Sequence, residues 1–511
     1  MWVTCFSPSY SFRLVSTLRT SEHRSPFDLA KRPILEAING ASTECLPYFQ
    51  LLREWVRECD QSHECKRPTG ANYWPTRVIF VGDPDPDKLV LVEKRGTGED
   101  YVTLSHCWGV QTEETRRFCT TQDNYQRRLQ GFSYNDLPKT FQDAVRVTRE
   151  LGKQHLWIDS LCIIQQNQED WKKEAGQMEN VFASAYCTIA ATSASGCRDG
   201  FLKPDLDSQH IEIQGIPGRP AYVSDFDKDV GEGPLSTRAW VLQERVLSRR
   251  TIHFSAEQTY WECGSGVRCE NFTKLECPPG RHYFVLDANF PTRLRTAGHD
   301  RTVDFIKYLF KKYSRCGITF ESDRDVAISG LVERIGASLE TGARYGIFTC
   351  FLADLLLWKR SDGEMADRIE YSGRTVPSWS WMAYSRGIDF ISDPTLVVPP
   401  HTDLCFHNNK PALIVKVRQF ANCRIEQEGE RYAIVADTGK MVGTLWFDRG
   451  YIEFRHCVVI GMRKDNMDDA RKTYYILVVR GKGPGQGYER LGVGEVEARY
   501  VSKKCNREEL W

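Results

Sequence analysis

Helical periodicity is the clearest signal along the chain. Between Leu46 and Cys59 the apolar residues Phe49, Leu52 and Val56 lie three or four positions apart, and Cys59 continues the series. This spacing predicts an amphipathic helix with one buried face. We expect the helix to pack as a lead-in on the domain that follows it.

Four more segments have the same periodicity. A helix is expected over residues 138–151, where proline suits the first turn and the inward positions are Phe141, Ala144, Val145, Thr148 and Leu151. Another follows in EDWKKEAGQMENVFASA, whose core-facing stripe is Trp171, Ala175, Met178, Phe182 and Ala185, with charged residues between them. Helices are also predicted over residues 301–315 and 325–342.

Strand-like runs alternate with helices between Tyr101 and Phe254. YVTLSH, HLWID and YCTIAA are the expected strands, and such alternation is typical of a parallel sheet covered by helices. The preceding RVIFVGDPDPDKLVLVEKR predicts two short strands around an Asp-Pro turn. From Thr375 onward β-rich runs dominate, namely ALIVKV, RYAIVA, GTLWF, YIEF and YYILVV.

The length of 511 residues requires more than one folding unit, because a single core stops growing near ~250–300 residues. The alternation of strands and helices, followed by the β-rich runs, predicts an α/β fold, a parallel sheet flanked by helices, with a β-rich C-terminal region. We divide the chain into an irregular N-terminal segment (1–45), a lead-in helix with short strands (46–100), an α/β core (101–265), a helical extension (266–374) and a β-rich region (375–511).

The composition of the chain argues against nucleic acid and membranes as binding partners. Lys plus Arg and Asp plus Glu each number 68, so no net field attracts nucleic acid or an anionic membrane. The 18 cysteines lack the spacing of a disulfide framework, which indicates reduced thiols and a cytoplasmic protein. No apolar run reaches the ~20 residues of a membrane span. The serine-rich, acid-free residues 1–19 faintly resemble a mitochondrial transit peptide, although an irregular start is preferred.

Three sequence blocks resemble the HET domain of fungal heterokaryon incompatibility proteins. They are YVTLSHCWG, then LPKTFQDAV with LWIDSLCIIQQNQEDWKKEAGQMENVFASA, and TRAWVLQERVLSRRTIHF. VPSWSWMAY and YERLGVGEV resemble segments that trail this domain. The resemblance implies a role in non-self recognition and programmed cell death, with partners that are further copies of the chain or other incompatibility proteins.

A weaker resemblance links HET domains to TIR domains, which have flavodoxin-like sheets and act as adaptors or cleave NAD. It implies that Trp240 and Glu244 correspond to the tryptophan and glutamate of a TIR helix, and that NAD would be a substrate with no other cofactor. Four residues make about one helical turn, so both side chains lie on one helix face. Glu244 is then the candidate catalytic carboxylate, since a carboxylate beside the ribose stabilises an oxocarbenium-like sugar.

Other residues are candidates to bind a ligand at the ends of the predicted strands. Ser105, His106 and Trp108 end the first strand, Gly109 follows them, and Asp159 ends the second. Ligands gather at this edge of doubly wound sheets. Several of these candidates also have a purely structural explanation. Glu244 could pair with Arg238 or Arg245, Trp240 could fill the core, and Gly109 could serve only the turn. Asp159 could cap the next turn, and Gln165 and Gln166 have the same two possible roles, ligand binding or local structure.

Two groups of residues that contain cysteine are candidates for a reactive or metal site. Adjacent strand residues point to opposite faces, so His106 and Cys107 cannot form a catalytic dyad. Cys59, His63 and Cys65 offer ligands that zinc prefers. The sequence shows no fourth ligand beside them, and Cys263, Cys269 and Cys277 form no convincing partner set, so no metal is assigned and the question stays open.

Two functions of different classes follow from these observations, beside a third in which Ser105, His106 and Asp159 only sense a ligand without turnover. One is an effector that consumes NAD through Glu244, and the other is a self-associating adaptor without catalysis. The sequence has no phosphate-binding loop, no dinucleotide-binding glycine motif after a strand and no H-E-x-x-H zinc motif, which disfavours NTP hydrolysis, Rossmann cofactors and zinc proteolysis.

Overall fold

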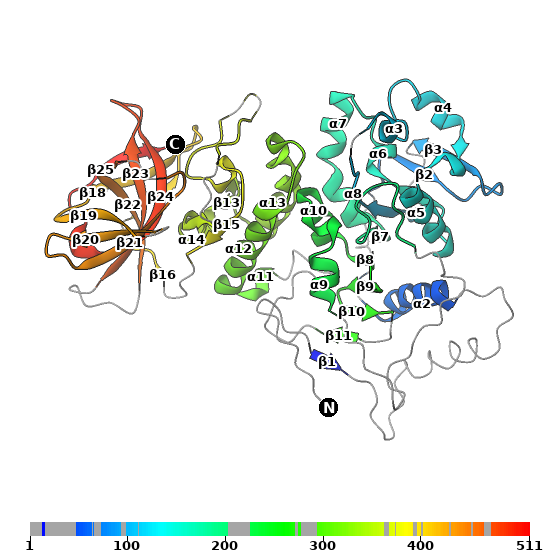
Figure 1. Ribbon diagram of the computed structural model, residues 1–511, viewed down its shortest axis with the longest axis horizontal. Coiled ribbons are helices and arrows are strands. Elements are labelled where there is room, and N and C mark those ends of the chain that lie inside the picture. Colours follow the sequence, from blue (N-terminus) through cyan, green and yellow to red (C-terminus); the bar gives the residue numbers. More distant parts are fainter. Residues whose placement is uncertain are drawn as a thin grey trace, which may run out of the picture. The chain divides into compact units, whose positions relative to one another are not determined.

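The computed structural model consists of two compact units, residues 1–293 and 294–511 (Figure 1). Their boundary falls inside the segment expected to be a helical extension. The structure describes residues 13–15, 47–63, 65, 73–93, 99–110, 112–202, 225–270, 274–276, 294–361, 367–371, 373, 375–391, 396–399, 402–428, 431–450, 453–463 and 472–511. The transit-peptide interpretation and Cys277 lie outside these residues, except for Arg13–Val15.

The first unit is built on one mixed sheet in which four neighbouring strands are parallel. These are β6 (His155–Trp157), β4 (Val102–Ser105), β7 (Cys187–Ala190) and β8 (Arg250–Phe254), in that spatial order. Numbered along the chain, the order is 2-1-3-4, as in flavodoxin-like sheets. The three strands expected from the sequence are confirmed as parallel, and all their residues are buried.

The sequence predicted a parallel sheet, but antiparallel strands extend the observed sheet on both sides. On one side β2 (Arg77–Phe80) pairs with β6, followed by β3 (Lys88–Glu93) and β5 (Phe132–Ser133). On the other side β8 is followed by β9 (Thr259–Cys263), β10 (Gly266–Cys269), β11 (Lys274–Glu276) and β1 (Arg13–Val15). The predicted hairpin around the Asp-Pro turn is therefore confirmed as β2 and β3.

Helices cover both faces of the sheet. On one face Ser105 and Tyr101 contact α10 (Ala239–Leu247) and α8 (Met178–Ser184). On the other, His106 meets Phe141 of α5 (Lys139–Glu150), against which α2 (Pro47–Ser62) packs. The predicted inward residues of α2 and α5 are all buried, which confirms both helices and their faces. Tyr48 also hydrogen-bonds Thr259 at 2.6 Å, so α2 does pack on the core.

The single helix expected over residues 169–185 is two helices. α7 (Gln168–Ala175) ends at Gly176 and α8 begins at Met178. Glycine lacks a Cβ and loses more conformational entropy in a helix than other residues, which favours a break at this position. The expected stripe is buried apart from Trp171, which is half-buried.

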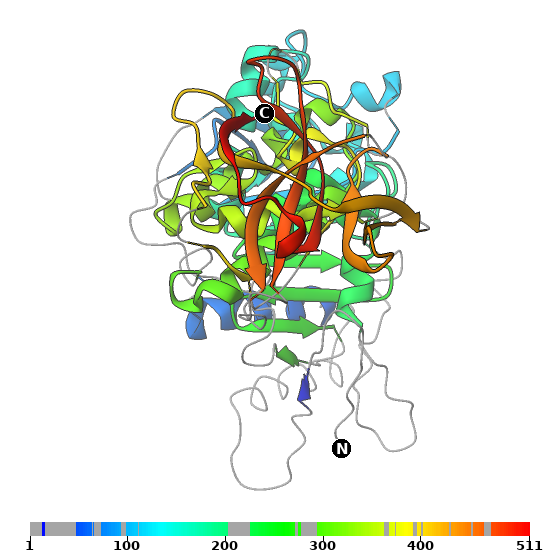
Figure 2. The ribbon, with the colours of Figure 1, turned by 90° about the vertical axis from the view of Figure 1, so that its left-hand side faces the viewer.

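The second unit joins helices to a β-rich region. α12 (His299–Arg315) and α13 (Val326–Ser338) confirm the two predicted helices. The strands of the ten-stranded sheet are coloured from orange to red in Figure 2. Five of them pair in a closed ring: β22 (His456–Arg463), β18 (Leu413–Gln419), β25 (Asn506–Leu510), β24 (Tyr488–Glu497) and β23 (Thr473–Gly481).

Three further strands extend this sheet from β24, each paired with the one before it. They are β21 (Met441–Phe447), β20 (Arg431–Ala436) and β19 (Cys423–Glu428). The expected strand YIEF is not one at Glu453 and Phe454, and its first two residues lie outside the described range. No helix among the described residues has the length and apolar character needed to cross a bilayer.

Candidate active site

The candidate residues gather where β4 and β6 end. In a 2-1-3-4 sheet the chain reverses its direction of progress between the first and third strands, here β4 and β7, and ligands bind outside the carboxyl ends of the strands at this point. Because side chains alternate along a strand, the candidates divide between two faces. Ser105 lies on the face covered by α10, and His106 on the face covered by α5.

Ser105 and Glu244 form the first half of the site. The Ser105 hydroxyl donates a hydrogen bond to Oε2 of Glu244, which α10 holds over the end of β4. Among the described residues no other group hydrogen-bonds this carboxylate, and no basic group forms an ion pair with it. Glu244 is buried, with 8% of its surface exposed.

The ion pairs considered for Glu244 go elsewhere. Arg238 donates to the backbone oxygen of His106 at 2.5 Å, and Arg245 pairs with Glu262 at 3.2 Å. Burial raises the pKa of the Glu244 carboxyl to about 7, with a smaller upward effect from Asp159, while Ser105 and Arg238 oppose the rise. A carboxyl that titrates near neutrality suits proton transfer at the pH of the cell.

His106, Trp108 and Asp159 form the second half. The indole N–H of Trp108 donates to Oδ2 of Asp159 at 2.7 Å, and the His106 and Trp108 rings are parallel with centroids 6.5 Å apart. Nδ1 of His106 lies 3.8 Å from Oδ1 of Asp159. Burial lowers the pKa of His106 to about 4, so its imidazole is neutral at physiological pH.

The carboxylate of Asp159 binds a backbone N–H of the turn after β6, which is the structural role expected from the sequence. Asp159 is the first residue of α6 (Asp159–Cys162), and Ile158 occupies the cap position. Its Oδ1 accepts the Ser160 backbone N–H at 2.6 Å, and about a quarter of its side chain is exposed. Gln165, by contrast, is tied to backbone oxygens of Asp159 and Ile163.

A small pocket opens beside this second half. Its lining consists of His106, Trp108, Phe118, Cys119, Phe141, Ser160 and Cys197. The pocket is narrow, with room for about one water molecule. Nε2 of His106 and Oγ of Ser160 are both buried without a hydrogen-bond partner among the described residues. Buried polar groups normally find partners, so the two atoms are available to a ligand.

Ser160 was missed in the sequence analysis. It directly follows Asp159, the last residue of the predicted strand HLWID, and this position was the available signal; the structure places Ser160 in α6. Trp240 lies on the same helix as Glu244 and packs partly buried against the hydrophobic core, so α10 uses its indole for packing. Cys107 packs with Leu235 and Val241, whereas the His106 ring packs against Phe141 of α5.

Gly109 serves the turn after β4 and a close approach between two loops. Its φ is +75°, and a Cβ there would lie 2.9 Å from the Cα of Gly196 in the loop after β7. Those two loops therefore meet at the point where the strand order reverses.

The strand order and the polar groups at this edge define an α/β protein with a flavodoxin-like arrangement of parallel strands. Residues 101–244 match the family model described as heterokaryon incompatibility protein (HET). The chain therefore carries a HET domain; the match begins just before β4 and stops inside α10, and it supports a role related to heterokaryon incompatibility. Comparisons with curated proteins and with solved structures gave no match.

Proposed function

We propose that the HET domain cleaves the nicotinamide–ribose bond of NAD, as the effector of a cell-death reaction in fungal non-self recognition. The observation that carries the proposal is Glu244, a buried carboxyl with a pKa raised to about 7 and one oxygen without a partner among the described residues. It lies at the strand end where doubly wound sheets bind their ligands. The weaker resemblance to TIR domains points to the same residue.

The reaction needs only water as co-reactant. The bond between the ribose C1′ and the nicotinamide nitrogen breaks, and its electron pair leaves with nicotinamide. The sugar becomes oxocarbenium-like, and ionised Glu244 would stabilise that charge or hold a ribose hydroxyl. Water then adds at C1′ and loses a proton, giving ADP-ribose.

The second half of the site would position the substrate. Asp159 has exposed carboxylate surface that suits ribose hydroxyls, and the Trp108 indole offers a ring for stacking. Neutral His106 and Ser160 have unpartnered polar atoms beside the pocket. Because the pocket holds about one water molecule, binding requires Trp108 to leave Asp159 and open the edge.

The closed edge of the sheet favours a second candidate function, that of a self-associating adaptor. The narrow pocket and the Ser105–Glu244 bond complete a packed edge without a ligand. In this alternative the HET domain recruits further copies or other incompatibility proteins in the cytoplasm, and Glu244 serves only the local structure.

NAD loss in solutions of purified protein at low and high concentration separates the two functions. Loss in the wild type that disappears in Glu244→Ala, with the circular dichroism spectrum unchanged, supports the hydrolase. Absence of turnover at every concentration rejects it. Light scattering on the same samples then tests for self-association, which the adaptor requires.

A further inference from the structure

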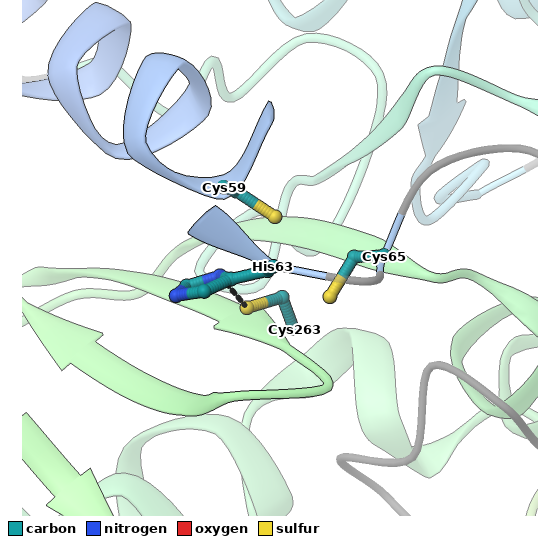
Figure 3. Close-up of side chains that lie close together, drawn as sticks. All are labelled: Cys59, His63, Cys65 and Cys263. Carbon is teal, nitrogen blue, oxygen red and sulfur yellow. Dashed lines mark hydrogen bonds between the residues drawn. The ribbon is translucent and has the colours of Figure 1, made fainter. Parts of the chain in front are cut away.

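Four potential metal ligands converge between α2 and the hairpin of β9 and β10. Cys59 comes from the last turns of α2, His63 and Cys65 from the segment after it, and Cys263 from the end of β9 (Figure 3). Their sulfur and imidazole atoms all lie within 4.8 Å of one another. We propose that Cys59, His63, Cys65 and Cys263 bind one structural zinc ion.

The distance between His63 and Cys263 fits tetrahedral zinc. Bonds of ~2.3 Å to sulfur and ~2.0–2.1 Å to nitrogen place a sulfur and a nitrogen ligand about 3.6 Å apart, and two sulfurs about 3.8 Å apart. Sγ of Cys263 lies 3.5 Å from Nδ1 of His63. Three cysteines and one histidine form a common ligand set of structural zinc sites.

Burial indicates a structural ion, because a catalytic zinc keeps one position open to water or substrate. Cys59, Cys65 and Cys263 have at most 4% of their surface exposed, and only His63 is half-buried. The four protein ligands leave no open position. All three cysteines are free thiols, and a disulfide between any two would leave the third without a partner.

The surroundings suit the charge of such a site. Three thiolates and Zn²⁺ sum to one negative charge. Arg250 stands directly opposite Cys263 in the β8–β9 pair and is 3% exposed, and opposed residues of an antiparallel pair share one face. Its guanidinium also lies 2.8 Å from Asp60 of α2. The buried cation therefore lies beside the thiolates and beside the helix that supplies one of them.

The ion would fasten segments that flank the HET domain match on both sides. α2 precedes residue 101 and β9 follows residue 244, so the site closes a loop of about two hundred residues around the domain. The linkage adds to the hydrogen bonds of Tyr48 with Thr259 and of Tyr186 with Asp60. Zinc would thus hold the lead-in helix on the core.

Metal content of the purified full chain tests the proposal. We expect about one zinc per chain in the wild type. Co²⁺ in its place should give thiolate-to-cobalt charge-transfer absorption. Cys263→Ser should lose the metal, while Cys269→Ser, a change to a buried cysteine of the adjacent strand outside the cluster, should keep it. Chelation should lower the Tm of the wild type and of Cys269→Ser.

If Cys263→Ser fails to fold, a second variant that keeps four metal ligands still tests the proposal. His63→Cys retains a ligand set that zinc accepts and should still bind about one ion. Wild-type protein that takes up neither Zn²⁺ nor Co²⁺, or that holds a disulfide within the cluster, overturns the proposal. So does zinc that stays bound in a folded Cys263→Ser protein.

Discussion

The hydroxyl of Ser105 donates a hydrogen bond to the carboxylate of Glu244, joining the end of β4 to α10 across 139 positions of sequence. The bond lowers the pKa of a carboxyl that burial raises to about 7. It therefore sets how much of Glu244 is ionised near neutral pH.

Ser105→Ala should shift the ionisation of Glu244 to higher pH. Loss of the donor leaves burial less opposed, so the pKa should rise above about 7. It should also destabilise the domain by ~1–3 kcal/mol, because a buried acceptor loses its partner. The pH at which NAD cleavage is half-maximal measures the shift. Thr103→Val, which removes another buried hydroxyl from β4, should leave this midpoint unchanged.

Glu244→Gln should alter the pH dependence of stability. A carboxyl whose pKa is raised in the folded state stabilises the fold below its unfolded value of about 4.5, and this contribution is lost as pH rises through about 7. The free energy of unfolding of the variant, relative to the wild type, should therefore increase across that interval by on the order of 3 kcal/mol. Urea unfolding at several pH values measures the trend, and a flat difference would show that Glu244 is not perturbed.

Gly109→Ala should destabilise more than Gly152→Ala. Both glycines have φ near +70°, at +75° and +68°, so both variants bear the strain of the left-handed region, about 1–2 kcal/mol. Only at Gly109 does a Cβ meet backbone, 2.9 Å from Gly196, whereas Gly152 has nothing within 4 Å. Equal Tm values for the two variants would contradict the close approach of the two loops.

Local patterns predicted much of the fold. α2, α5, α12 and α13 were found because each buries a regular stripe, which the spacing of apolar residues records directly. β9, β10 and β11 were not predicted as strands. They belong to the large sheet through pairing with β8 and with one another, which is a tertiary property that composition does not show.

The candidate site was predicted less completely. Strand ends pointed to His106, Trp108 and Asp159, which do lie together. The sequence did not reveal that Glu244 would bind Ser105, because that contact depends on where α10 packs. Nor did it reveal Cys263 as the fourth member of the cluster with Cys59, since the two are brought together by α2 packing beside β9.

In the second unit, Asp448→Ala should be strongly destabilising. Its carboxylate accepts two hydrogen bonds from the fully buried Arg490, whose guanidinium also donates to backbone oxygens of Leu356 and Trp358. Removing one partner of a buried ion pair costs ~3–5 kcal/mol. Asp448→Leu combined with Arg490→Met should recover part of this loss. Thermal unfolding of the wild type, Asp448→Ala and the double variant measures these changes in stability. An Asp448→Ala protein as stable as the wild type would contradict the ion pair.

The central claim is that the protein cleaves NAD through Glu244. The most direct test measures nicotinamide release by the purified wild type, Glu244→Gln and Glu257→Gln. Glu257 is an exposed glutamate between β8 and β9, so its variant makes the same change of charge away from the site. The account predicts release by the wild type and by Glu257→Gln and none by Glu244→Gln. Release that persists in Glu244→Gln, or is absent from folded wild-type protein at every concentration, would contradict it.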